Sequence, residues 1–247
     1  MSHEFELHHE IDLAATPEQV WEAIATGPGI DSWLMGSNTV EPREGGTASM
    51  SMPGFTAEST VTTWDPPNAF GIRSEPDEEG AFMAFEYLIE GRSGGSTVLR
   101  LVHSGVMGGN DWESEYDALK KGNPMYLRTL ATYLEHFGGR TAVPVAAFGP
   151  PQANQDVVWD GLKRALGLTG TVTEGDKVAY VDADGTEVNG IVDSALEPNF
   201  LGVRTEDALL RFVGRGGMVL TGHHLFGAVD RQEAEEFWGS WLAKTLA

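Results

Sequence analysis

Apolar and polar residues alternate from Gly46 to Val106, and this period-two pattern restricts the fold more than any other feature of the chain. Four turn signals interrupt it, at Pro53-Gly54, 65–68, 76–80 and 91–95. The connections are too short for crossover helices, so neighbouring strands must be antiparallel. The pattern predicts a meander of four or five strands with one face buried and the other exposed to water.

A strand and two helical regions are predicted on either side of the meander. Phe5–Ala15 alternates and is expected to be a strand. Thr16-Pro17-Glu18-Gln19 has the residues of a capping box, so a helix is expected to begin there and to end at Gly27-Pro28-Gly29. A second helical region starts near residue 111, and Asn123-Pro124 is expected to cap a restarted, longer helix that Gly138-Gly139 ends.

Three short matches, in the same order, relate the second half of the chain to the first. They pair Val20–Ile24 with Val158–Leu162, Pro67–Ser74 with Pro198–Thr205, and Val98-Leu99 plus His103 with Val219-Leu220 plus His224. The sequence offset falls from one match to the next, as expected for a duplicated unit that has lost residues in its second copy. Two domains are therefore expected, at 1–140 and 141–247.

Charge and apolar content limit the partners and the location of the protein. The 247 residues carry a net charge of −21 and include 7 Trp and 11 Phe, so a folded chain with a core is expected. Both halves are acidic, which leaves no basic face for nucleic acid. No apolar run approaches the roughly 20 residues of a membrane span, and Met1–Glu4 is not the start of a signal peptide. We therefore expect a cytoplasmic protein with no nucleic acid partner and no membrane span.

The sequence contains no recognisable metal, cofactor or catalytic motif. The absence of cysteine excludes thiolate metal sites and thiol nucleophiles. His8-His9 and His223-His224 are adjacent pairs, which point to opposite faces of a strand and cannot bind one ion together. Asp182-Ala183-Asp184-Gly185 is interpreted as a hairpin turn, and Gly214–Gly217 precedes a strand and not a phosphate-binding helix. No metal and no cofactor are predicted.

Four segments of the first half carry a resemblance to a known superfamily. They are Thr16–Ile24 followed by Trp33, Val61–Pro67, Leu101–Val106, and the final helix with Trp112 and Tyr133-Leu134. These residues resemble the SRPBCC superfamily, also called START or Bet v 1-like, and within it the AHSA1-like group named after the activator of Hsp90 ATPase. Residues 141–247 resemble the same fold more faintly, as a shortened second domain that lacks a counterpart of the Trp33 segment.

The resemblance implies an α+β helix-grip fold, here duplicated, in which a curved antiparallel sheet wraps around a long C-terminal helix. Such folds often hold an apolar cavity between sheet and helix. The alternation and the helix stripe predict its lining and ligand-binding residues: Trp33, Met50, Met52, Trp64, Phe85, Tyr87, Leu101, His103, Trp112, Tyr116, Tyr126 and Leu130. Taken singly, each of the apolar and aromatic residues is expected to be ordinary core. Tyr87, His103 and Tyr126 are the expected polar groups, with a hydrogen-bonded core histidine as the alternative for His103.

Three functions are compatible with this sequence. In the first, the resemblance implies a binding protein that holds a hydrophobic small molecule in the first domain, while the second is a degenerate structural partner. In the second, the same cavity belongs to an aromatase/cyclase-like enzyme acting on a lipophilic or polyketide-like substrate, with His103 or Tyr87 in catalysis. In the third, the protein has a chaperone partner, as an Hsp90 co-chaperone; this is less expected because the chain begins directly with the SRPBCC strand. Without a catalytic motif, the binding protein is favoured over the enzyme.

Overall fold

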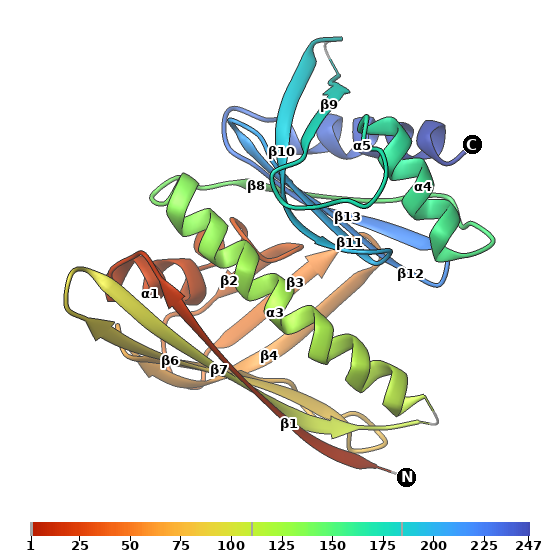
Figure 1. Ribbon diagram of the computed structural model, residues 1–247. Coiled ribbons are helices and arrows are strands. Elements are labelled where there is room, and N and C mark those ends of the chain that lie inside the picture. The colour runs from red at the N-terminus through yellow and green to blue at the C-terminus, as the bar shows by residue number, and fades with distance from the viewer. Residues whose placement is uncertain (1, 110, 184) are drawn as a thin grey trace. The chain divides into compact units, whose positions relative to one another are not determined.

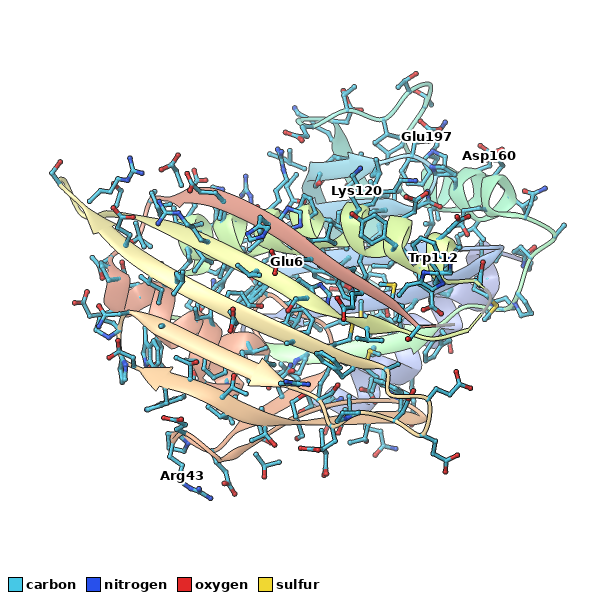
Figure 2. The ribbon with its side chains drawn as sticks, turned by 90° about the horizontal axis from the view of Figure 1, so that it is seen from below. Glu6, Arg43, Trp112, Lys120, Asp160 and Glu197 are labelled. Carbon is cyan, nitrogen blue, oxygen red and sulfur yellow. The ribbon has the colours of Figure 1, made fainter. Side chains whose placement is uncertain are left out.

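The computed structural model describes residues 2–109, 111–183 and 185–247 (Figure 1). The chain divides into two compact units, 1–140 and 141–247. Each unit is an antiparallel sheet that packs against a C-terminal helix, so the helix-grip fold is present twice. In the first unit, exposed charged side chains lie on the sheet and on its C-terminal helix, as Glu6 and Lys120 illustrate (Figure 2).

The first unit contains a seven-stranded sheet with the order β1-β7-β6-β5-β4-β3-β2. Its strands are β1 (His3–Leu13), β2 (Ser37–Val40), β3 (Thr47–Met52), β4 (Phe55–Asp65), β5 (Ala69–Arg73), β6 (Phe82–Arg92) and β7 (Ser96–Met107). The predicted meander is confirmed as β3 to β7, in which every strand pairs with the next. The four-residue strand β2 was not predicted, because it is too short to show a period-two pattern.

Two helices follow β1, where the sequence predicted one. The capping box that starts α1 (Pro17–Ala25) is present: the Thr16 hydroxyl accepts from the Gln19 amide at 3.4 Å, and Gln19 Oε1 accepts from the Thr16 amide at 2.9 Å. Gly27-Pro28-Gly29 ends α1 but also begins the short helix α2 (Gly27–Ile30). Thr26 caps α2, since its hydroxyl accepts from the Gly29 amide at 3.1 Å.

Replacing Thr16 with alanine is expected to lower the free energy of unfolding of the first unit by about 1 kcal/mol. The change removes an acceptor for an amide that the helix cannot satisfy itself. Urea unfolding measures the effect, and Thr16→Ser, which keeps the hydroxyl, is the matched control. Equal losses in the two variants would show that the cap contributes nothing.

The helix α3 (Trp112–Phe137) runs without interruption through Pro124, contrary to the predicted restart. Proline removes one backbone hydrogen bond, but the buried residues Asn123 and Leu127 on either side of it keep the helix against the sheet. Asn123 is therefore not a helix cap, and its side chain bonds to histidines of the sheet. Gly138 ends the helix as predicted. Figure 1 shows α3 crossing the face of the sheet.

The second unit repeats this architecture in a shorter form. Its strands are β8 (Val143–Phe148), β9 (Lys177–Val181), β10 (Glu187–Leu196), β11 (Phe200–Arg204), β12 (Ala208–Arg215) and β13 (Met218–Leu225), and its helices are α4 (Gln155–Ala165) and α5 (Arg231–Thr245). The sheet order β8-β13-β12-β11-β10-β9 matches that of the first unit without its last strand. The predicted turn at 182–185 joins β9 to β10; its residue 184 lies outside the described residues.

The three sequence matches lie in equivalent elements, but the last one is displaced by one residue. The matched pairs are α1 with α4, β5 with β11, and β7 with β13. His103 lies on the inner face of β7 and bonds to Asn123 of α3. On β13 it is His223, not the predicted His224, whose ring contacts the inward Trp238 of α5 at 4.2 Å. A one-residue shift moves a side chain to the opposite face of a strand, so His223 is the counterpart of His103.

Candidate ligand-binding cavity

The first unit contains a cavity of about 310 Å³ between the inner face of its sheet and α3. Side chains from β2 to β7 form one wall, and residues of α1, α2, the following segment and α3 form the rest. The alternation of the strands explains this arrangement, because Phe85 and Tyr87 of β6 lie opposite His103 and Leu101 of β7 on the same face.

The residues that line the cavity include no Asp, Glu, Lys or Arg, although the chain carries a net charge of −21. The acidic residues of the lining strands, such as Glu58 and Glu86, are exposed on the outer face of the sheet. A charged ligand would lose its hydration here without gaining an ion pair. The cavity is therefore suited to an uncharged, largely apolar molecule.

Seven of the twelve residues predicted from the sequence line the cavity. They are Trp33, Met50, Phe85, Tyr87, Leu101, His103 and Tyr126. Trp33 is nearly fully buried, and its indole N–H donates to the Ala23 carbonyl at 2.8 Å, so its orientation is fixed by α1. Their role in ligand binding stays a prediction.

The other five predicted residues lie outside the lining, each for a local reason. Trp64 packs against Trp21 of α1 and against Phe70, after a bulge that shifts the register of β4. The other four are Trp112, which stacks on His3; Tyr116, whose ring contacts Phe5; Leu130, which is fully buried; and Met52, at the end of β3. Helix periodicity predicted that Trp112, Tyr116 and Leu130 lie on the sheet-facing side of α3. Periodicity does not distinguish a residue that is packed in the core from one that lines a cavity.

Sequence reasoning missed several lining residues. Phe70 and Ile72 follow the period of β5 and were detectable, since they alternate within the repeated segment 67–74. Asn38, on the unpredicted strand β2, had no such signal; its side chain donates to Asp31 at 3.0 Å. Asn123 was noticed but interpreted as a helix cap, because Asn before Pro is the usual sequence of a helix start.

Two tyrosines, Tyr87 and Tyr126, line this apolar space. Burial raises the pKa of Tyr87 and of Tyr126 above the ordinary range of tyrosine, so both remain protonated at neutral pH. Neither hydroxyl has a hydrogen-bond partner among the described residues. Each therefore has both a donor and acceptor capacity available to a ligand.

His103 is another polar residue of the lining and lies at the end of a short hydrogen-bonded chain. Its Nδ1 lies 3.2 Å from Asn123 Oδ1, and Asn123 Nδ2 lies 3.3 Å from His9 Nε2. The ring stacks on Phe85 at 4.0 Å and meets the edge of Phe5 at 5.3 Å. Its other nitrogen, Nε2, is buried without a hydrogen-bond partner in the described part of the chain.

Burial lowers the pKa of His103 to about 4, an effect that the Asn123 hydrogen bond opposes and His9 reinforces. Between pH 6.5 and 4 the unfolded chain binds a proton here that the folded chain does not. The free energy of unfolding is therefore expected to decrease as the pH is lowered through this window. The loss relative to neutral pH should reach about 3 kcal/mol at pH 4. Urea unfolding at a series of pH values from 7 to 4 measures this loss. The free energy of unfolding of His103→Leu should decline less steeply with decreasing pH than that of the wild type. Parallel plots of unfolding free energy against pH for the two proteins would contradict this explanation.

In the second unit, aromatic side chains fill the space between α5 and the sheet. Trp238 is 2 % exposed and contacts Tyr180, Phe212, His223 and Trp241 at ring distances between 4.2 and 6.0 Å. His223 Nδ1 accepts from the Arg211 amide at 2.9 Å, and the Arg211 guanidinium forms a buried ion pair with Asp193 at 2.9 Å. The space between α5 and this sheet is packed as a core, whereas the first unit has a cavity between α3 and its sheet.

Comparison with known families and structures follows the boundaries of the two units. Residues 14–135 match the family described as activator of Hsp90 ATPase homolog 1-like protein. The first unit belongs to this family. The match covers nearly all of the AHSA1-like unit, including both helices of its N-terminal half and most of α3. No curated protein matches the chain.

One solved structure matches the chain across both units. The di-domain ARO/CYC protein BexL from the BE-7585A biosynthetic pathway has a TM-score of 0.50 at 14% identity, covering 98% of this chain and 96% of its own. A Mesorhizobium loti protein has a TM-score of 0.47 at 22% identity, covering 54% of this chain and 98% of its own. The Aha1 protein from Colwellia psychrerythraea has a TM-score of 0.44 at 20% identity, covering 55% and 98%. BexL shows that two such units occur in one chain.

The described residues lack two kinds of feature. No helix in 2–109, 111–183 or 185–247 is long and apolar enough to cross a membrane. Within the same ranges, no group of three or more His, Cys, Asp or Glu is arranged to hold a metal ion.

Proposed function

We propose that the AHSA1-like unit binds an uncharged hydrophobic small molecule in the cavity between its sheet and α3. The observation that carries the proposal is a space of about 310 Å³ whose lining has no charged residue but includes the polar side chains of Tyr87, His103 and Tyr126. Ligand sites are typically apolar with a few polar groups that orient the ligand. The volume is at the lower end of that class, which favours a molecule of two or three rings.

A titration with the uncharged fluorescent probe N-phenyl-1-naphthylamine tests the proposal. We expect its fluorescence to rise on transfer from water to the cavity and to saturate at one probe per chain. Native mass spectrometry of the purified protein would in addition reveal a lipophilic molecule that is retained through purification. A linear, non-saturating fluorescence response would contradict the proposal, since it indicates only weak surface adsorption.

The second unit is proposed to be a structural partner without a ligand. The support is the packed space between α5 and the sheet, where Trp238 is buried against Phe212 and His223. Probe stoichiometry tests this assignment, because two probes per chain would require a second site.

Catalysis in the same cavity is a second candidate, which the neutral, partly unsatisfied ring of His103 favours. His103 lines the cavity, its Nε2 has no hydrogen-bond partner among the described residues, and an unprotonated imidazole nitrogen is chemically able to accept a proton. The name of BexL refers to an ARO/CYC activity, and the aromatase/cyclase-like hypothesis transfers that class of chemistry to this chain. If His103→Ala retained probe affinity but lost product formation with a polyketide-like substrate, the enzyme would be favoured. An Hsp90-directed role stays a prediction from the family resemblance.

A further inference from the structure

We propose that His223 is an acid-sensitive switch in the second unit: its neutral ring joins β12 to β13, and its protonation separates the two strands. The proposal is independent of ligand binding in the first unit. It rests on the contacts of three residues that lie on three strands of the second sheet, Asp193 of β10, Arg211 of β12 and His223 of β13.

The first observation is a gap in the backbone pairing of β12 with β13. Residues 208–209 and 212–215 of β12 pair with β13 in one common register, whereas Leu210 and Arg211 between them are not paired with it. Within this gap, the Arg211 amide donates to Nδ1 of His223 at 2.9 Å. A side chain thus supplies the acceptor for a buried backbone N–H and connects the strands where their pairing is interrupted.

The second observation fixes the protonation of the ring. A backbone N–H can only donate, so Nδ1 of His223 is unprotonated and the proton of the neutral ring lies on Nε2. The ring is fully buried and contacts the rings of Phe212 and Trp238, at 5.0 and 4.2 Å. An additional proton therefore has to bind to Nδ1, where it would face the Arg211 N–H and remove the hydrogen bond.

The surroundings of the ring disfavour a positive charge. The strand β8 beside β13 contains no titratable residue, and neither do the buried positions of α4 and α5. The groups that act on the ring are Arg211 of β12 and His224 of its own strand; together with burial, which has the largest effect, they lower the pKa of His223. The nearby carboxylate, Asp193, already pairs with the Arg211 guanidinium at 2.9 Å. A protonated His223 would place a second buried cation beside this pair.

The consequence is an opening of β12 and β13 at acid pH. Below pH 6.5, the opened chain binds a proton at His223 that the closed structure excludes, so the equilibrium shifts towards the open form as the pH is lowered. One such group raises the equilibrium constant for opening about ten-fold per pH unit. Above pH 6.5 both forms are neutral at this residue, and its contribution no longer changes with pH.

Hydrogen exchange of the full chain between pH 7 and 5, followed by mass spectrometry, tests the switch. After correction for the intrinsic exchange rate, the opening constant of peptides from β12 and β13 should rise about ten-fold per pH unit below 6.5. In His223→Asn the side chain retains an acceptor but does not titrate, so the rise should be less than two-fold per unit. His8→Asn, which removes an exposed histidine of the first unit, should behave as the wild type.

A nitrogen NMR titration of the wild-type protein tests the same proposal without requiring any variant to fold. At pH 7 we expect Nδ1 of His223 at the shift of an unprotonated ring nitrogen and Nε2 at that of a protonated one. On acidification the signals of the folded form should lose intensity without changing their shifts. A ring that is protonated on Nδ1 at pH 7, or that titrates near pH 6.5 in the folded protein, would overturn the proposal. A folded His223→Asn variant with the wild-type pH dependence of exchange would also overturn it.

Discussion

Replacing Trp238 with alanine is expected to lower the free energy of unfolding of the second unit by about 3–5 kcal/mol. The indole is 2 % exposed and its ring contacts aromatic partners from β9, β12, β13 and its own helix. Alanine would leave a void in the middle of this cluster, which the rigid sheet cannot close. Since small domains are stable by only about 5–15 kcal/mol, such a loss would affect much of the folded population.

Urea unfolding followed by tryptophan fluorescence and circular dichroism measures the effect. Lys244→Ala, at an exposed position of the same helix, is the control and should change stability by less than about 0.5 kcal/mol. A loss below about 1 kcal/mol in Trp238→Ala would mean that the cluster is loosely packed. The interpretation of the second unit as a filled counterpart of the first would then be wrong.

Replacing Ser59 with tryptophan is expected to weaken binding of N-phenyl-1-naphthylamine at least ten-fold. Ser59 lines the cavity on the inner face of β4, where it pairs in register with Ala48 of β3. A serine side chain leaves that space open, and an indole at the same position would occupy a large part of the 310 Å³. The loss in affinity arises because probe and indole cannot share the volume.

The matched control is Glu58→Trp, which adds the same side chain one residue earlier. Glu58 is exposed on the outer face, so binding should remain at the wild-type level. Urea unfolding of both variants establishes that they are folded when the titration is made. Equal probe affinity in wild type and folded Ser59→Trp would place the binding site elsewhere.

Most of the first sheet was predictable because period-two alternation is a strong signal when one face is buried. The five strands β3 to β7 and the capping box of α1 follow directly from residue order and local chemistry. The short strand β2 and helix α2 were not predictable, since each is only four residues long. Their positions depend on contacts with Thr26 and Asp31 and not on any periodic pattern.

Two errors show where local rules are overruled by packing. Asn123-Pro124 has the sequence of a helix start, yet α3 continues because Asn123 and Leu127 are held against the sheet. The match of His103 to His224 failed by one residue, since two adjacent histidines cannot be told apart without knowing which faces the core. In the cavity, periodicity found Tyr87, Leu101 and His103, but it had no means of separating lining from core.

The most direct test of the central claim is a crystal structure of the protein grown with saturating N-phenyl-1-naphthylamine. We expect density for one probe molecule per chain inside the first unit, between β6, β7 and α3. An empty cavity, with the probe bound only at the surface or in the second unit, would contradict the account.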